Sequence, residues 1–154
     1  MKSLFYLIVF TLALISCKKV DCDIYTNEVT YQTIEKSALY GNGDEEIGEE
    51  NFVITSDSEW TTLIDKIDAA NNVSDDFDNV PVNFDEQIVI ACFDQVRPNG
   101  GYSLSISQVE YNGSQLEVSI EKSGGSGMTT SVITQPFHII VLDKCEKNPD
   151  VTFQ

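Results

Sequence analysis

The sequence predicts an α+β domain in which one principal amphipathic helix packs on a mostly antiparallel, twisted β-sheet. One segment shows helical periodicity behind a capping signal, and several others alternate apolar and polar residues as strands do. A strong hairpin signal, Asn112-Gly113, joins two of these strands. Because only one helical pattern is visible, antiparallel hairpins are favoured over a β-α-β arrangement of parallel strands.

The helix is predicted over residues 57–70. Before it stands Ser56-Asp-Ser-Glu59, a capping box in which Ser56 caps a backbone N–H and Glu59 reaches back. Asn71-Asn72 should end the helix. The apolar stripe should lie on the sheet, which places Trp60 in the core rather than at a ligand site. The stripe follows helical spacing: Trp60, Leu63, Ile64 and Ile67.

Strand patterns account for most of the remaining chain. Ile88–Phe93 is apolar on both faces, which is typical of a central strand. Tyr102, Leu104 and Ile106 alternate with serines, so they predict a half-exposed strand that the hairpin returns. The return strand has one apolar face, Leu116, Val118 and Ile120. Further strands are expected at 24–35, 52–55, 132–134, 137–142 and 151–153.

The composition limits the classes of function. A chain of 154 residues with 42% apolar residues fits one folded domain. With 25 acidic and 9 basic side chains, its net charge of −16 argues against nucleic acid or an anionic membrane surface as the main partner. Its single histidine, His138, rules out a multi-histidine metal centre.

The N-terminus has the pattern of an export signal. Lys2 is followed by Leu4–Ile15, an apolar run of 12 residues, whereas a bilayer-spanning helix needs about 20. The run ends in Leu14-Ile15-Ser16-Cys17, which resembles a bacterial lipobox, where the cysteine thiol accepts a diacylglycerol and becomes the new N-terminus. The alternative is an ordinary signal, or a signal anchor, with an incidental cysteine.

These features divide the chain into three parts. Residues 1–16 are the expected lipoprotein signal peptide, 17–23 the acylated Cys17 with its tether, and 24–154 a single α+β domain. Two or three acyl chains hold a protein firmly on a membrane. A lysine rather than an aspartate follows Cys17, so we expect a lipid-anchored envelope protein of the outer membrane, with the leaflet left open.

The other cysteines separate by their surroundings. Cys92 lies in an apolar strand pattern and is expected to be a small buried hydrophobe. Cys22 and Cys145 lie in polar sequence, and export exposes them to oxidising conditions, so a Cys22–Cys145 disulfide is our hypothesis. Two free thiols are the alternative. Without a C-x-x-C pair, no metal site is expected from these cysteines.

The sequence predicts no catalytic residues and no cofactor. His138 lies inside a strand pattern, where a structural role is expected, and no Gly-x-Ser-x-Gly elbow is present. A Cys92–His138 dyad is conceivable, but an apolar setting should raise the pKa of the thiol. Acidic loop residues offer a Ca²⁺- or glycan-binding alternative without the pattern of a Ca²⁺ loop: Asp75-Asp76, Asp78 and Asp85-Glu86.

One turn offers a candidate partner-binding site. Gly100 and Gly101 suggest a positive φ or a close backbone approach, for which a tight hairpin connection is the simplest explanation. The functional interpretation is that the Arg97–Tyr102 and Gly124–Thr130 loops form one partner-binding edge. Arg97 and Tyr102 are of residue types that are enriched at interface hot spots. The predicted binding residues are therefore Arg97, Gly100, Gly101 and Tyr102.

An ordered set of motifs between Trp60 and Phe153 resembles the C-terminal domain of PrcB-type protease-complex subunits. Cys92 stands where that family would have an aliphatic residue. The resemblance implies a small bacterial module, often carried by lipoproteins, that is an accessory to an exported protease and has no catalytic motif of its own. The motifs are Glu59-Trp-Thr-Thr-Leu63, Val82-Asn-Phe84, Gln87-Ile-Val-Ile-Ala91, Pro98-Asn-Gly-Gly-Tyr-Ser-Leu-Ser-Ile106, Thr134-Gln-Pro-Phe-His-Ile-Ile140 and Val151-Thr-Phe153.

Two functions therefore compete at this point. The first is a membrane-anchored, non-catalytic interaction subunit, with an exported protease as the possible protein partner. The second is a surface lipoprotein module that binds a ligand such as a glycan, a peptide or Ca²⁺ through its acidic loops. A stand-alone enzyme ranks third.

Overall fold

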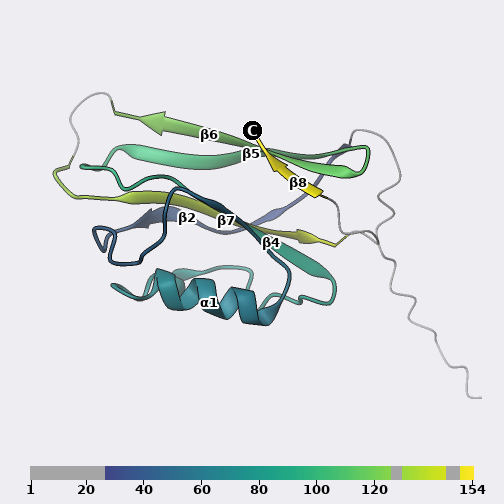
Figure 1. Ribbon diagram of the computed structural model, residues 1–154, viewed down its shortest axis with the longest axis horizontal. Helices are drawn as coiled ribbons and strands as arrows, with labels where there is room; N and C mark the ends of the chain where they lie inside the picture. The colour runs from purple at the N-terminus through teal and green to yellow at the C-terminus, as the bar shows by residue number, and fades with distance from the viewer. Residues whose placement is uncertain (1–26, 126–129, 145–149) are drawn as a thin grey trace, which may run out of the picture.

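The protein folds into three layers, as the computed structural model shows for residues 27–125, 130–144 and 150–154 (Figure 1). An outer sheet has the strand order β1-β5-β6-β8, and a central sheet has the order β2-β7-β4-β3. The helix α1 lies on the other face of the central sheet. The elements are β1 (Asn27–Glu28), β2 (Gln32–Leu39), β3 (Asn51–Ile54), α1 (Asp57–Ile67), the 3₁₀ turn η1 (Val73–Asp76), β4 (Gln87–Phe93), β5 (Tyr102–Asn112), β6 (Gln115–Gly124), β7 (Gln135–Asp143) and β8 (Asp150–Phe153).

The α+β prediction is confirmed, with the strands divided between two sheets rather than one. All neighbouring strands are antiparallel except β6 and β8, which are parallel. The predicted strand at 24–35 explains the division. Its described part forms β1 in the outer sheet and β2 in the central sheet, so the chain crosses between layers. At the crossing, the Tyr31 hydroxyl donates to the Ile106 carbonyl at 3.0 Å.

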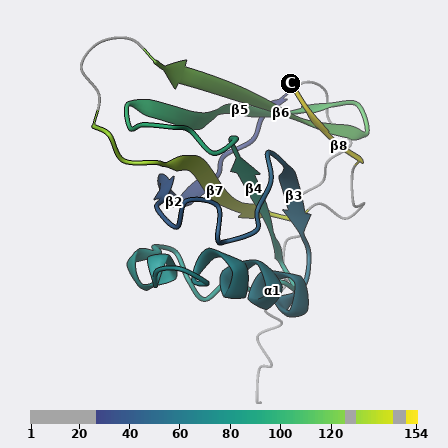
Figure 2. The same ribbon diagram turned by 60° about the vertical axis from the view of Figure 1, so that its left-hand side comes forward.

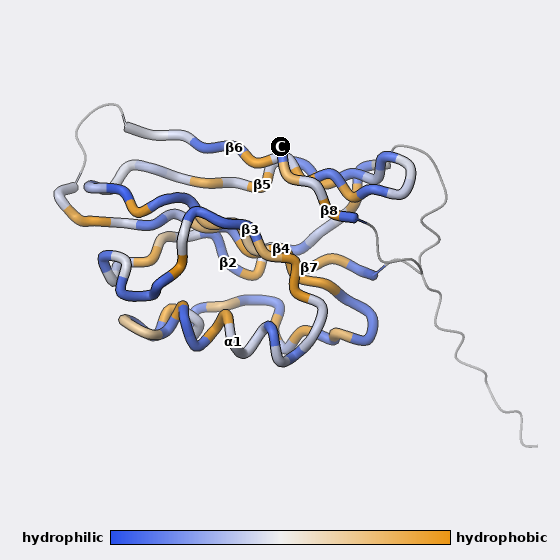
Figure 3. Tube along the Cα trace, in the orientation of Figure 1, coloured by the Kyte–Doolittle hydropathy of each residue, from blue (hydrophilic) through white to orange (hydrophobic). Residues whose placement is uncertain are grey.

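The central sheet is buried on both faces, as the apolar run at 88–93 predicts. In the hydropathy view, the apolar colour is concentrated along its strands (Figure 3). Successive side chains of a strand point to opposite faces, so β4 and β7 serve two cores. Those facing α1 are Val89, Ala91, Phe93, Phe137, Ile139 and Val141. Those facing the outer sheet are Ile88, Ile90, Cys92, Ile140 and Leu142.

The predicted hairpin joins β5 to β6. Asn112 pairs with Gln115, and Gly113 in the turn has φ of +64°. A bulge between Ile106 and Gln108 shifts the side-chain alternation by one residue. The inward residues are therefore Leu104 and Ile106 before the bulge, and Val109 and Tyr111 after it.

The capping signal of α1 is confirmed. The Ser56 hydroxyl accepts the Glu59 N–H at 3.4 Å, and the Glu59 carboxylate accepts the Thr55 N–H at 2.8 Å. The bond from the Thr55 backbone is the largest of several that lower the pKa of Glu59. The helix ends at Ile67 rather than at 70, because the Asp68 carboxylate accepts the N–H and hydroxyl of Ser74 and turns the chain into η1.

A row of aromatic rings connects α1 to the central sheet. The half-buried Trp60 ring lies 6.2 Å from Phe77, which lies 6.5 Å from Phe137. Phe137 stacks on Phe93 with ring centroids 5.5 Å apart. The sequence prediction that Trp60 packs into the core is therefore confirmed at the margin of that core.

The predicted strand at 132–134 does not form. Only Thr134 makes an isolated bridge, to Arg97. In a continued ladder the next hydrogen-bonded pair would join Asn99 to Val132, but the Asn99 carbonyl accepts the Thr134 hydroxyl at 3.1 Å instead. Val132 and Ile133 are consequently exposed, and β7 begins at Gln135.

His138 lies between the two sheets and is 3% exposed. Its Nδ1 accepts the Ile106 N–H at 2.8 Å, which leaves the proton on Nε2, where it is donated to the Thr33 hydroxyl at 3.1 Å. Burial, and secondly the charge of Lys36, lowers the pKa of His138 to about 4. The histidine is thus neutral and has a partner on each nitrogen, as predicted for a structural residue.

His138 should make stability depend on pH. The pKa is about 4 in the folded state and 6.5 in the unfolded chain, so the unfolded chain binds more protons between these values and is favoured as the pH falls. Below pH 6.5 the free energy of unfolding should fall more steeply for the natural protein than for His138→Gln, by up to about 1.4 kcal/mol per pH unit. Urea unfolding between pH 7 and 4.5 measures both slopes. Parallel curves would contradict this account, because both proteins carry the same carboxylates.

Candidate partner-binding surface

Several loops gather at one end of the two sheets. Antiparallel pairing places Leu39, at the end of β2, beside Gln135, at the start of β7. The end of β4 reaches the same place, since Phe93 pairs with Phe137. The Gly100 N–H donates to the Thr130 carbonyl at 3.0 Å, which brings in the loop before β5. We call residues 40–50, 94–101, 124–125 and 130–134 the loop end.

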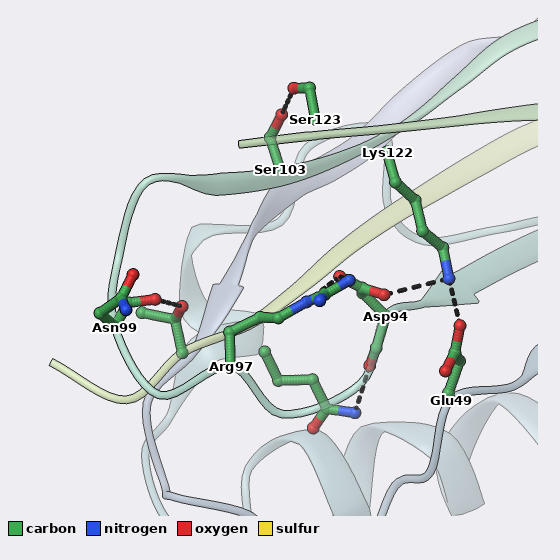
Figure 4. A network of polar contacts seen from close by, with 9 residues as sticks. Glu49, Asp94, Arg97, Asn99, Ser103, Lys122 and Ser123 are labelled. Carbon is green, nitrogen blue, oxygen red and sulfur yellow. Dashed lines mark hydrogen bonds and ion pairs between the residues drawn. The ribbon is translucent and has the colours of Figure 1, made fainter. Parts of the chain in front are cut away.

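A buried carboxylate holds the loop end together (Figure 4). Asp94 is 1% exposed and accepts a hydrogen bond from Arg97 Nε at 2.7 Å. Its other oxygen lies 3.0 Å from Lys122 Nζ, and Lys122 also pairs with Glu49. Burial acts to raise the pKa of Asp94, but the hydrogen bonds from Lys122 and Arg97 outweigh it and hold that pKa below its usual value. Asp94 therefore stays charged and ties the loop after β4 to β6.

Gln135 extends this support to the loop before β3. Its side-chain amide donates to the carbonyl of Asp94 at 2.9 Å and to that of Ile47 at 2.9 Å. The neighbouring Thr134 hydroxyl donates to the Asn99 carbonyl at 3.1 Å. Side chains at the start of β7 thus fix the backbone of two loops, which makes the loop end a rigid surface.

The structure brings Arg97 and Tyr102 together. The guanidinium carbon of Arg97 lies 4.7 Å from the centre of the Tyr102 ring, a cation–π contact. The Arg97 backbone exchanges two hydrogen bonds with Thr134, at 2.7 and 3.1 Å. Because Arg97 also binds Asp94, its side chain positions the loop as well as forming part of its surface.

The two glycine-containing loops approach as closely as the sequence predicts. A Cβ on Gly100 would lie 2.4 Å from the Thr130 hydroxyl, and Gly101 has φ of +89°. Gly124 has φ of +124°, and a Cβ there would lie 2.2 Å from the Gly101 carbonyl oxygen. The two segments therefore pack backbone against backbone. That they bind a partner stays a prediction.

Exposed apolar side chains add to this surface, and sequence reasoning missed them. Among the described residues, four of the five exposed large hydrophobic side chains belong to the loop end. Val132 and Ile133 have the sequence of a strand, so they were expected to pair in a sheet rather than to be exposed. The four are Tyr40, Val96, Val132 and Ile133, and the fifth is Val80.

The other candidate residues have different outcomes. Cys17, Cys22 and Cys145 lie outside the described residues, so lipidation and the disulfide stay predictions. Cys92 is buried and stands opposite His138 in the β4–β7 ladder. Burial raises the pKa of the Cys92 thiol to about 12, so it is protonated at neutral pH. Both ring nitrogens of His138 already have other partners.

The described part of the chain shows no built metal centre. Across residues 27–125, 130–144 and 150–154, no three His, Cys, Asp or Glu side chains are arranged to hold a metal ion. Within the same ranges, no helix combines the length and apolar character that crossing a bilayer requires.

One known protein family matches part of the chain, from β4 to β7. Residues 88–143 match the family model described as PrcB C-terminal. The matched segment contains nearly all of β4, the β5–β6 hairpin and β7, together with Arg97, Gly100, Gly101 and Tyr102. The resemblance seen in the sequence is confirmed there, while the motifs at 59–63, 82–84 and 151–153 lie outside the match. No curated protein and no solved structure matches the chain.

The close packing of the loop end predicts a difference between two glycines. Gly124→Ala forces a Cβ against the Gly101 carbonyl and should lower the free energy of unfolding by about 3 kcal/mol. Gly113→Ala meets nothing within 4 Å and has only the strain of its positive φ, so about 1 kcal/mol is expected. Urea unfolding followed by Trp60 fluorescence measures both. Equal losses would mean that the two segments do not pack closely.

Proposed function

We propose that this protein is a membrane-anchored accessory subunit that binds another protein through its loop end and does not itself catalyse a reaction. The observation that carries the proposal is the presence of four exposed apolar side chains on the loop end, which also holds the half-buried Arg97 and borders the half-buried Tyr102. Two of these side chains, Val132 and Ile133, are adjacent in the chain, and exposed apolar groups that lie together are typical of interaction sites. A surface that is ordered before binding loses less conformational entropy when a partner docks.

The family match suggests the kind of partner. A PrcB C-terminal segment covers β4 to β7 and much of the loop end. The sequence resemblance implies an accessory role beside an exported protease, and we propose such a protease as the partner. The apolar side chains would bury against it, while Arg97 and Tyr102 would contribute the larger contacts that are typical of interface hot spots.

We propose that residues 1–16 are removed and that a lipid on Cys17 anchors the mature protein in the cell envelope, at the outer membrane. The positions of Asn27 and of the loop end along β5 support an orientation in which the loop end points away from the anchor. Asn27 pairs with Tyr111 near one end of β5, whereas Tyr102 at the other end borders the loop end. These positions on β5 are about 30 Å apart at the rise of an extended strand. Asn27, the first described residue, therefore lies at the end of the outer sheet opposite to the loop end.

A non-catalytic role fits the chemistry of the described residues. The Cys92 thiol has a raised pKa, and His138 is committed to Ile106 and Thr33. For the Ca²⁺ alternative, no three acidic side chains within the described ranges are arranged to hold a metal ion.

Capture of the partner tests the proposal. Val96→Ser, Val132→Ser and Ile133→Ser combined should weaken capture of a protease from solubilised envelope by about tenfold or more, because the apolar contact area is lost. Val80→Ser is the matched control, since Val80 is an exposed valine outside the loop end. Mass spectrometry of the captured proteins identifies and quantifies the partner.

Two results would contradict the proposal. The first is equal capture by the triple variant and the control, which would exclude the loop end. The second is turnover of a substrate by the purified protein that depends on Cys92 or His138. A separate test concerns the anchor: mass spectrometry of the protein from envelope should find residues 1–16 removed and a diacylglycerol on Cys17, and an unmodified Cys17 would contradict the lipid anchor.

A further inference from the structure

The two edges of the central sheet are treated differently. The edge of β2 is covered, because the Asp78 N–H donates to the Ile34 carbonyl at 3.0 Å and the Asn79 side chain donates to the Thr33 carbonyl at 2.6 Å. On the opposite side, β3 is the last strand, and within the described ranges no backbone group pairs with its outer edge. Proteins usually cover or blunt such edges, since a free edge is a template for another strand.

The register identifies the free backbone groups. The Phe93 N–H donates to the Glu50 carbonyl at 3.0 Å, in line with the antiparallel pairing of β3 and β4. Hydrogen-bonded and non-hydrogen-bonded pairs alternate along such a ladder. Phe52 and Ile54 therefore direct their backbone groups to β4, while Asn51 and Val53 direct theirs outward. Two N–H donors and two carbonyl acceptors are available to an incoming strand.

An apolar groove runs beside this edge, between β3 and α1. Its volume is about 300 Å³, and the apolar residues lining it include Phe52, Ile54 and Leu63. One residue of each charge, Glu59 and Lys66, also lines it from α1. Ser58 and Thr62 of α1 present small side chains on the opposite wall. Figure 2 shows β3 beside β4 at the margin of the central sheet, with the end of β3 close to α1. A strand added to β3 would place alternate side chains over this groove.

Charge favours one kind of occupant. Glu50 precedes β3 and Asp57 follows it, so an exposed carboxylate flanks each end of the edge. Of the neighbouring carboxylates, Glu49 already pairs with Lys122 and Glu59 already binds Thr55. A second copy of the chain pairing β3 with β3 would bring these acidic flanks together, which is unfavourable. A segment with basic residues avoids that repulsion and complements the flanks.

We propose that the outer edge of β3 takes up an extended segment of a partner protein as an added strand. The segment alternates apolar side chains, which enter the groove, with lysine or arginine residues that pair with the acidic flanks. This surface adjoins the loop end at Glu50 but is centred on Asn51–Ile54, and it goes beyond the function proposed above. Main-chain hydrogen bonds give affinity in such complexes, and the groove gives specificity.

The probe is a labelled eight-residue peptide of alternating lysine and valine, added to the purified full-length protein. Binding is followed by fluorescence anisotropy, and NMR should locate it through shifts of the Asn51 and Val53 amide signals. The same peptide methylated on every backbone nitrogen cannot donate hydrogen bonds to β3. Its affinity should therefore be lower by about tenfold or more. A peptide that alternates glutamate and valine should also bind weakly, because of the acidic flanks.

Two protein variants test the edge directly. Val53→Pro removes an N–H that points away from β4, so it deletes no ladder bond and should weaken binding about tenfold. Val53→Ala is the matched control and should bind almost as the natural protein does. Thr62→Arg, on the exposed helical wall, adds bulk and positive charge to the groove and should also weaken binding, which keeps the test valid if Val53→Pro fails to fold.

Three results would overturn the proposal. They are undiminished binding by a folded Val53→Pro variant, equal binding of the methylated peptide, and a dimer of the natural protein that Val53→Pro disrupts. The loop-end variant that carries serine at positions 96, 132 and 133 should bind the peptide normally. Failure of the edge and failure of the loop end are thus distinguished, because Val53→Pro leaves the loop end unchanged.

Discussion

The architecture depends on burying both faces of the central sheet. Strands β4 and β7 lie side by side, and their side chains fill two separate cores, one beneath α1 and one beneath the outer sheet. Both α1 and the outer sheet bury their apolar side chains against this shared layer. Apolar burial is the main favourable term in folding, so the pairing of β4 with β7 is the step on which the other layers depend. His138 of β7 adds a polar connection between the two sheets. One ring nitrogen binds Thr33 of β2, and the other binds Ile106 of β5.

The same layer determines what its ends can present. The loop end is built on the last residues of β2 and β4 and the first of β7, and Asp94 and Gln135 hold its backbone from beneath. Binding loops on a rigid sheet can display apolar side chains without collapsing onto them. At the margin of the layer, β3 keeps two residues with outward backbone groups. One sheet therefore supports both proposed interaction surfaces, a rigid set of loops and a free strand edge.

The sequence predicted those elements that depend on residues close together in the chain. Ser56 and Glu59 identified the start of α1, and the run at 88–93 identified a strand buried on both faces. Non-local features were not predictable. The crossing of the chain between sheets depends on the partners of β1 and β2, and the Asp94 network joins Glu49, Asp94 and Lys122 from distant segments. Val132 and Ile133 have strand-forming side chains, but the Asn99 carbonyl that would pair with Val132 accepts the Thr134 hydroxyl instead.

Native-state hydrogen exchange tests the central claim most directly. If the doubly buried sheet holds the fold together, amides of β4 and β7 that bond within the ladder should exchange only through global unfolding, with an opening free energy equal to that from urea unfolding. The outward amides of Asn51 and Val53 should exchange much faster, through local fluctuation. Exchange of the Ile90 and Ile140 amides at an opening free energy well below the global value would contradict the account, because the shared layer would then open while the rest stays folded.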